Sequence, residues 1–422
     1  MLSHALQPSF GGGSGLDCSA PRPVLVLSKG SCSSGLNCAH GGGPASPSVR
    51  RQLVQCWLDQ HATADTGEVD GSVRPGTDLQ ASIDRLVTAG GGTLRLGPGR
   101  FELRRPLVLR SGVSIVGSGQ KKTLIVPAPG ANWPLLTNVD GDELDRIVRG
   151  APDRHIPGRG MVSSSHGDAA GGELKDVALS DLRIDCGLRE DADGGMLLPA
   201  YYHETDHPLH DAAKAAEYRR AGRPELLGVF LTSANDTRPM RRIEVRRVSI
   251  ENCAMGLHAR GVLNLTVAES EFVHNGMGAE HWHNLYVRRG SGVSVVRNLL
   301  ANGTSANGIN LYQVQSGEVR ANLVLGNRFR GVRVDTCAWG GAPRSARGVA
   351  VEGNIVLESG ELGLIVRECE GGEVADDNFV AGNGRLYHLY HPSGFKLGLS
   401  ANIPYCADEC DVPLETYTRR SG

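Results

Sequence analysis

The chain has 422 residues, of which 57 are glycine, and only 5% of its residues are aromatic. This composition favours a coil of short strands and tight turns over a helical bundle, and the length is sufficient for a large core. A formal net charge of -2 argues against nucleic-acid or membrane partners recruited by bulk charge, and no apolar run approaches membrane-spanning length.

Residues 1–76 are rich in Gly, Ser and Pro, and we expect them to be poorly ordered. They contain no clear signal peptide, so secretion is allowed by the sequence but not indicated, and the compartment stays open. The segment Gln52–Gln60 has the pattern of a short amphipathic helix, although nothing in the sequence indicates what it packs against.

Ordered structure is expected from residue 77. Asp78 is a candidate helix cap, Gly90 a stop, and the apolar stripe between them consists of Leu79, Ile83, Leu86 and Val87. Alternating strands follow from Thr93, and a polar-faced helix at this point is what covers the open end of a solenoid.

Two interruptions follow the first strands. Residues 131–172 are expected to form a long loop, and residues 195–227 an insertion with a short helix at His210–Arg220. The insertion carries His203, His207 and His210, which are spaced like zinc ligands, but Pro208 interrupts a helix there. We therefore expect a solvated lid rather than a metal site.

A five-residue phrase recurs six times. Its second and fourth places are apolar or Ala, and its third and fifth places are mostly polar; the phrases begin at Gly228, Gly256, Asn284, Gly308, Gly331 and Gly363. Alternation with period two predicts strands with one buried face, and recurrence predicts that they stack as successive coils. The sequence therefore predicts an all-β fold, a parallel β-helix over residues 77–384.

The segment Asp78–Gly119, with its helix followed by GGGTLRLGPGRFEL and SGVSIVGSG, resembles the N-terminal cap and first coils of the pectin-lyase-like right-handed parallel β-helix superfamily. With the repeats, the resemblance extends to about Gly384. It implies the fold and a carbohydrate partner, since the superfamily includes polysaccharide lyases, uronate epimerases, glycoside hydrolases and phage tailspikes. The local signatures of its mannuronan epimerases, pectate lyases and polygalacturonases are not found in this chain.

Stacking of the coils predicts two columns of outward side chains, about 4.8 Å apart from coil to coil. The third places give Phe230, His258, Tyr286, Asn310, Arg333 and Ile365, and the fifth places give Thr232, Arg260, Arg288, Tyr312, Asp335 and Arg367. His281 and His283 enter the strand of Tyr286 at the margin of this patch. Such a mixture of His, Tyr, Asn and Arg suits an extended anion, although a hydrated solenoid face could also carry these residues.

The patch fits β-elimination or C5 epimerisation of a uronate better than hydrolysis, because hydrolysis of a glycosidic bond needs two carboxyl groups and the columns hold only Asp335. Arg288 is expected to neutralise the substrate carboxylate, with Tyr286 and His258 exchanging protons. Neighbouring cations are expected to make Tyr286 easier to ionise. The expected substrate-binding residues are Arg260, His281, His283, Asn310, Tyr312, Arg333 and Asp335.

No cofactor is expected, because a calcium ion would need clustered carboxylates that the columns lack. The alternatives are a non-catalytic glycan-binding or tailspike-like protein and a glycoside hydrolase. The sugar and the oligomeric state stay open.

Two sets of asparagines recur with the coils and are expected to be structural. Asn298, Asn322, Asn354 and Asn378 predict a stacked amide ladder, and Asn252, Asn275, Asn302 and Asn327 predict turns in the left-handed conformation. Among the ten cysteines, Cys337 and Cys369 are expected to be neighbours, more as stacked thiols than as a disulfide. Residues 385–422 are expected to cover the last coil.

Overall fold

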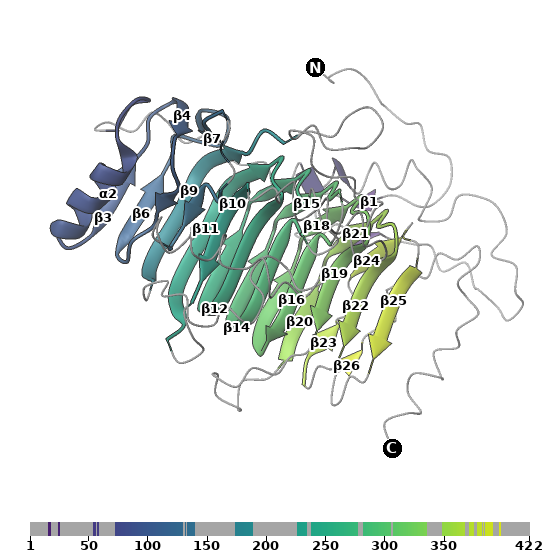
Figure 1. Cartoon of the computed structure of the whole chain (residues 1–422). Helices are drawn as coiled ribbons and strands as arrows, with labels where there is room; N and C mark the ends of the chain where they lie inside the picture. The colour runs from purple at the N-terminus through teal and green to yellow at the C-terminus, as the bar shows by residue number, and fades with distance from the viewer. Residues whose placement is uncertain are drawn as a thin grey trace, which may run out of the picture.

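The computed structural model describes most of the β-helix and shorter pieces outside it. The described residues are 72–129, 131, 133–139, 174–188, 226–233, 238–276, 282–304, 307–335, 348–367, 371–374, 378–381 and 383, with pieces at 16–17, 24–25, 54–55, 57–58, 385–390 and 396–397. Strands β3 to β26 belong to one sheet wound into successive coils, and strands of adjacent coils pair in parallel (Figure 1). The predicted all-β parallel β-helix is confirmed.

Each coil contributes strands to three faces. The first face contains β5 (Leu107–Val108), β8 (Leu136–Thr137), β10 (Leu227–Thr232), the starts of β12 (Met255–Ala268) and β14 (Leu285–Val296), β16 (Ile309–Val314), β19 (Arg330–Asp335), β22 (Leu362–Arg367) and β25 (Arg385–Tyr390). Because β25 pairs with β22, the coils continue past residue 384, where the sequence suggested a boundary.

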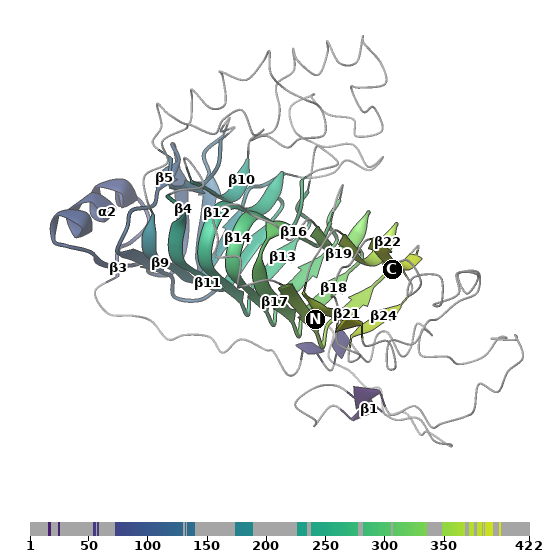
Figure 2. The same cartoon turned by 90° about the horizontal axis from the view of Figure 1, so that it is seen from below.

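The second face contains β3 (Gly92–Arg95), β6 (Val113–Val116), the starts of β9 (Lys175–Asp185) and β11 (Met240–Glu251), the ends of β12 and β14, β17 (Ser316–Arg320), β20 (Gly348–Glu352), β23 (Glu373–Val374) and β26 (Lys396–Leu397). The third face contains β4 (Gly99–Leu103), β7 (Thr123–Pro127), the ends of β9 and β11, β13 (Glu271–Val273), β15 (Leu299–Ala301), β18 (Leu323–Leu325), β21 (Ile355–Leu357) and β24 (Phe379–Ala381). In Figure 2 the first-face strands β10, β16, β19 and β22 follow one another along the axis, with β13, β18, β21 and β24 on a separate side. Strands β1 (Leu16–Asp17) and β2 (Val24–Leu25) pair with each other outside this sheet.

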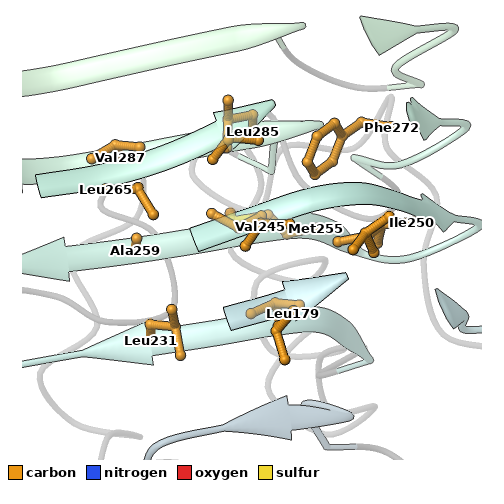
Figure 3. Close-up of a cluster of buried hydrophobic side chains, with 14 of the residues drawn as sticks. Leu179, Leu231, Val245, Ile250, Met255, Ala259, Leu265, Phe272, Leu285 and Val287 are labelled. Atoms are coloured by element: carbon orange, nitrogen blue, oxygen red, sulfur yellow. The ribbon is translucent and has the colours of Figure 1, made fainter. Parts of the chain in front are cut away.

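The core is a set of aliphatic stacks inside the coils. The second and fourth places of the repeated phrase all lie inward and are at most 1% exposed: Val229, Leu257, Leu285, Ile309, Val332 and Leu364, and Leu231, Ala259, Val287, Leu311, Val334 and Val366. Figure 3 shows Leu231, Ala259 and Val287 above one another on successive coils. Burial of these stacks provides the main driving force for closing the coils.

Glycine opens most of the phrases because the corner has no room for a side chain. A Cβ added at Gly331 would lie 2.3 Å from Cγ1 of Val356 and 2.7 Å from the carbonyl oxygen of Gly363 in the next coil. The close approach of the neighbouring backbone is therefore what selects glycine at this place.

The predicted amide ladder is present at the corner before the third face. Asn298, Asn322, Asn354 and Asn378 are at most 1% exposed, and each of the first three donates from Nδ2 to the next side-chain oxygen at 2.8 to 3.0 Å. The side-chain oxygens of Asn322, Asn354 and Asn378 also accept from the backbone N–H of the preceding asparagine, for example Asn298 N to Asn322 Oδ1 at 2.9 Å, and Asn298 Oδ1 accepts from Ser270 N at 3.0 Å. The ladder satisfies buried polar groups that would otherwise be left unpaired.

The second set of asparagines divides between two roles. Asn252 and Asn302 have φ of 52° each, as predicted for left-handed turns. For Asn275 and Asn327 the prediction is wrong: both are buried and belong to a second amide ladder through Asn284, which accepts from Asn275 at 3.0 Å and donates to Asn327 at 2.9 Å. A buried amide is driven to satisfy its hydrogen bonds, and the ladder does so.

Helix α2 (Leu79–Thr88) lies at one end of the stack, beside β3 (Figure 1). Asp78 caps it by accepting from Ala81 N at 3.0 Å, and Leu79 and Ile83 are buried against the first coil. Val87 is 43% exposed, so its assignment to the buried stripe is wrong, because the helix contacts the coil along a narrower stripe.

Two features tie distant parts of the chain to the coils. A disulfide joins Cys186 and Cys253, which follow the third-face strands of neighbouring coils. Trp57 is 6% exposed, packs with Leu323, Ile355 and Leu357 on the outside of the third face, and donates from its indole N–H to Ala321 O at 3.0 Å. This contact shows what the described part of the segment Gln52–Gln60, around Trp57, packs against.

Several predicted features lie outside the described residues. They are the loop at 131–172 apart from its first residues, the insertion at 195–225 with its helix and three histidines, the pair Cys337 and Cys369, and the tail beyond Leu397. Among the helices of the described segments, none is long and apolar enough to span a membrane.

Candidate functional site

The two predicted columns are present in the register of the first face. Phe230 pairs with His258, His258 with Tyr286, Tyr286 with Asn310, Asn310 with Arg333 and Arg333 with Ile365. The fifth places align in the same way, from Thr232 through Arg260, Arg288, Tyr312 and Asp335 to Arg367. We refer to these twelve aligned residues as the site row.

The site row is much less exposed than an outer sheet face was expected to be. His258, Arg260 and Asn310 are 3 to 5% exposed and Asp335 is 2% exposed, whereas Tyr286 and Arg288 are half-buried. Large side chains at the coil spacing cover one another, because each residue has a neighbour of similar size directly above and below it. The site row is therefore a desolvated strip, in which electrostatic interactions are stronger than on a hydrated face.

Three aromatic rings are in contact across the neighbouring strands β10, β12 and β14. The His258 ring lies 5.0 Å from the Tyr286 ring, centroid to centroid and nearly parallel, and 5.3 Å from the Phe230 ring, edge to face. Burial, with smaller contributions from Arg288 and Arg260, lowers the pKa of His258 to about 3. Its imidazole is therefore neutral at physiological pH, and its buried Nε2 atom has no hydrogen-bond partner.

The expectation that nearby cations ease the ionisation of Tyr286 is wrong. Burial raises the pKa of its phenol above the ordinary value of 10.0, and the opposing effects of Arg288 and Arg333 do not offset it. Loss of hydration disfavours the phenolate more than the two cations favour it. At neutral pH Tyr286 is a phenol that can donate a proton.

Arg288 lies two residues after Tyr286 on β14, so the two side chains are on the same face of the strand. Its guanidinium carbon lies 5.6 Å from the centre of the Tyr312 ring. Its Nε atom is buried without a hydrogen-bond partner. Arg260 pairs with Arg288 in the neighbouring coil. The two guanidinium groups concentrate positive charge beside the stacked rings, where a carboxylate would bind most favourably.

His283 lies against Tyr286 from the start of the same coil, with its ring 5.0 Å from the Tyr286 ring in an edge-to-face arrangement. Its Nδ1 accepts from Asn307 N at 3.2 Å, and its Nε2 lies 2.8 Å from Nδ2 of Asn310. A neutral ring whose Nδ1 accepts carries its proton on Nε2 and needs an acceptor there. A half-turn of the Asn310 amide supplies it, because it moves the unpartnered Oδ1 to that place and points the amide N–H groups into the site row.

Asp335 is held between two arginines. Arg333 binds it, with Nε 3.1 Å from Oδ2, and Nε of Arg367 lies 3.7 Å from Oδ1. Arg333 is 20% and Arg367 40% exposed, whereas Asp335 is 2% exposed. The carboxylate of Asp335 is therefore hydrogen-bonded to Arg333 and ion-paired with Arg367, two arginines that solvent can reach.

The structure brings together nine of the ten predicted site residues; His281 lies outside the described residues. The sequence did not indicate Asn307, whose contribution is a backbone N–H, or the ion pair of Arg367 with Asp335. No group of three or more His, Cys, Asp or Glu within the described segments could hold a metal ion.

No protein-family model and no curated protein matches this chain. Solved structures do: the A-module of mannuronan C-5 epimerase AlgE6 from Azotobacter vinelandii has 17% identity, covers 79% of this chain and 81% of its own, and gives a TM-score of 0.48. A tailspike protein of E. coli bacteriophage HK620 has 16% identity, covers 74% of this chain and 47% of its own, and gives 0.43.

An exopolygalacturonase from Thermotoga maritima has 13% identity, covers 80% of each chain and gives a TM-score of 0.40. At such values these similarities carry no argument about function. The class of fold, a parallel β-helix, rests on the register of the strands themselves. The predicted resemblance to the pectin-lyase-like superfamily is confirmed at this level, the level of fold.

Proposed function

We propose that the protein acts on an acidic, uronate-containing polysaccharide and removes the proton on the carbon next to the carboxylate, by β-elimination or C5 epimerisation. The observation that carries this proposal is the alignment of Arg260 and Arg288 with His258 and Tyr286 on two neighbouring coils. It combines a place for a carboxylate with a neutral base and a protonated acid in one desolvated strip.

The guanidinium groups of Arg260 and Arg288 bind the carboxylate of the uronate. The proton next to a carboxylate is weakly acidic until that charge is neutralised, and the same contacts stabilise the enolate-like transition state. The bound carboxylate also offsets the two cations that help to lower the pKa of His258, so substrate binding makes His258 a stronger base.

His258 accepts the proton from C5, and Tyr286 donates a proton. In elimination Tyr286 protonates the glycosidic oxygen as the bond from C4 to that oxygen breaks and a C4–C5 double bond forms. In epimerisation it returns a proton to C5 from the opposite face. Both routes keep Tyr286 as a phenol in the free protein, as its raised pKa requires.

The test is turnover of a panel of polyuronates, followed by the ultraviolet absorbance of unsaturated products and by new reducing ends. We expect Tyr286→Phe and Arg288→Ala each to lower the rate by at least about 100-fold. Arg320→Ala, on the second face and ion-paired with Glu318, is the matched control and should retain the parent rate. New reducing ends without unsaturation would instead indicate a hydrolase.

A non-catalytic glycan-binding protein is the second candidate, and the burial of His258 Nε2 favours it, because a base must reach its proton. Binding of polyuronates without any turnover would support this candidate. Hydrolysis is less well supported, since Asp335 is the one carboxylate of the site row and both Arg333 and Arg367 neutralise it.

A further inference from the structure

The site row is closed at its β10 end. The coil that precedes His258 presents Phe230 and Thr232, which are 0% and 3% exposed. The backbone of Thr232 forms two hydrogen bonds with the side chain of Asn138. Thr232 N donates to Asn138 Oδ1 at 2.9 Å, and Asn138 Nδ2 donates to Thr232 O at 2.8 Å. Neither Phe230 nor Thr232 offers a charged group, so among the described residues an acidic sugar finds no charged partner beyond His258 in that direction.

The site row opens in the other direction. In that direction Arg288 and Tyr312 are half-buried, Arg333 is 20% and Arg367 40% exposed, and Asp335, between the last two arginines, is 2% exposed. Within the part of the chain that the structure describes, the polar groups available to a polymer whose first unit lies at Arg260 and Arg288 are therefore those of β16, β19 and β22.

A second place for an anion lies in that direction. Arg333 is two coils beyond Arg288, about 10 Å along the axis at the coil spacing. Its guanidinium group and that of Arg367 are fixed by Asp335 and reached by solvent. Since one sugar unit of an extended chain is about as long as one coil, a carboxylate here belongs to the second unit after the reacting one.

The coil between the two anion sites offers neutral groups. Asn310 presents its amide N–H groups there once its oxygen accepts from His283, and the Tyr312 ring lies beside Arg288. These groups suit the hydroxyl and ring oxygens of an intervening unit.

We propose that the substrate binds by one chain end, with the terminal unit at Arg260 and Arg288 and a second carboxylate, two units along, at Arg333 and Arg367. This inference rests on the proposed function for the nature of the substrate and adds to it the direction of binding. For elimination it predicts release of the terminal unit from the reducing end, because the bond that breaks joins C4 of that unit to the rest of the polymer; epimerisation would change that unit without releasing it. It makes Asp335 a positioning residue for the second carboxylate.

The test measures the binding of di- to hexasaccharides of galacturonate, mannuronate and guluronate by calorimetry, with product sizes followed in parallel. We expect the affinity to rise sharply from the disaccharide to the trisaccharide, the first length whose last unit can place a carboxylate at Arg333 and Arg367. Arg367→Ala, at an exposed position, should weaken the binding of the trisaccharide and longer oligomers about tenfold and leave the disaccharide unchanged. Asp335→Asn should do the same, and Arg320→Ala should do neither.

A mixture of internal fragments early in the reaction, or equal weakening of all lengths by Arg367→Ala, would overturn the inference. Failure of every oligomer to bind would overturn it as well. Length-dependent binding without turnover would uphold the inference and reject the proposed chemistry, so the two can fail separately.

Discussion

His258 is a buried histidine that folding keeps neutral. Its pKa of about 3 in the folded protein lies far below the ordinary 6.5, mainly because burial removes the hydration of the imidazolium ion. Between these two values the unfolded chain binds a proton that the folded protein does not, so stability falls as the pH falls from about 6.5 towards 3. The residue that serves as the proposed base therefore destabilises the fold in mild acid.

This linkage gives a prediction for His258→Gln. Between pH 7 and pH 5 the parent should lose about 2 kcal/mol of unfolding free energy more than the variant, at about 1.4 kcal/mol for each pH unit below 6.5. Urea unfolding at both pH values measures the difference, and any constant effect of the substitution cancels. His274→Asn, at an exposed turn, is the control and should follow the parent; the same behaviour in His258→Gln would show that His258 is not held neutral by burial.

Tyr286 shows why residue identity alone did not determine protonation. Its neighbours in the register were predictable, and they are cations that favour a phenolate. Burial has the opposite effect and raises the pKa of Tyr286. The extent of burial depends on how completely the surrounding side chains exclude water, and the alternation of apolar and polar residues in the sequence does not show this. The same limit applies to Asp335, which was predicted as a substrate contact and lies beneath two arginines.

At the scale of the elements, the amide ladder fixes the corner before the third face. The side chain of Asn322 makes four hydrogen bonds: its Nδ2 donates to Val295 O at 2.9 Å and to Asn354 Oδ1 at 2.9 Å, and its Oδ1 accepts from both N and Nδ2 of Asn298. Removing it leaves buried donors and acceptors of two neighbouring coils unpaired.

We therefore expect Asn322→Ala to lower the unfolding free energy by about 2 to 4 kcal/mol, since each unsatisfied buried group costs about 1 to 3 kcal/mol. Thermal or urea unfolding measures the change. Asn302→Gly is the control, because glycine tolerates its φ of 52° and only an exposed contact with His274 is lost. Equal effects of the two substitutions would mean that the ladder is not a main determinant of stability.

The register between strands of adjacent coils was predictable to the residue. Each repeated strand begins at a glycine or asparagine and has its apolar residues at the second and fourth places, so a shift by one residue would expose those apolar side chains. The roles of Asn275 and Asn327 were not, because an asparagine at a corner suits either a left-handed turn or a ladder. Only the space available in the folded corner distinguishes the two.

At the scale of the whole molecule, the disulfide between Cys186 and Cys253 closes a loop of 67 residues across two coils. This pairing was not predictable from the sequence, since the two cysteines lie on either side of the long insertion and match no spacing motif. Coil geometry brings them together: Asp185 and Glu251 are paired in register, and Cys186 N donates to Glu251 O at 3.1 Å.

Loop closure in the unfolded chain predicts that the bond contributes about 4 kcal/mol to stability. The double variant Cys186→Ala, Cys253→Ala should unfold at a correspondingly lower urea concentration, and reductant should lower the stability of the parent but not that of the variant. A parent that is insensitive to reductant under unfolding conditions would contradict the presence of the bond.

The measurement that tests the account most directly is proton NMR of polyuronates incubated with the protein in D₂O, because it detects proton removal from C5 by either route. We predict loss of the H5 signal or the appearance of a vinyl proton with the parent and with Arg320→Ala, and neither change with Arg288→Ala or His258→Gln. Unchanged spectra for every polyuronate, or changes that persist in both site variants, would contradict the assignment of this chemistry to the site row.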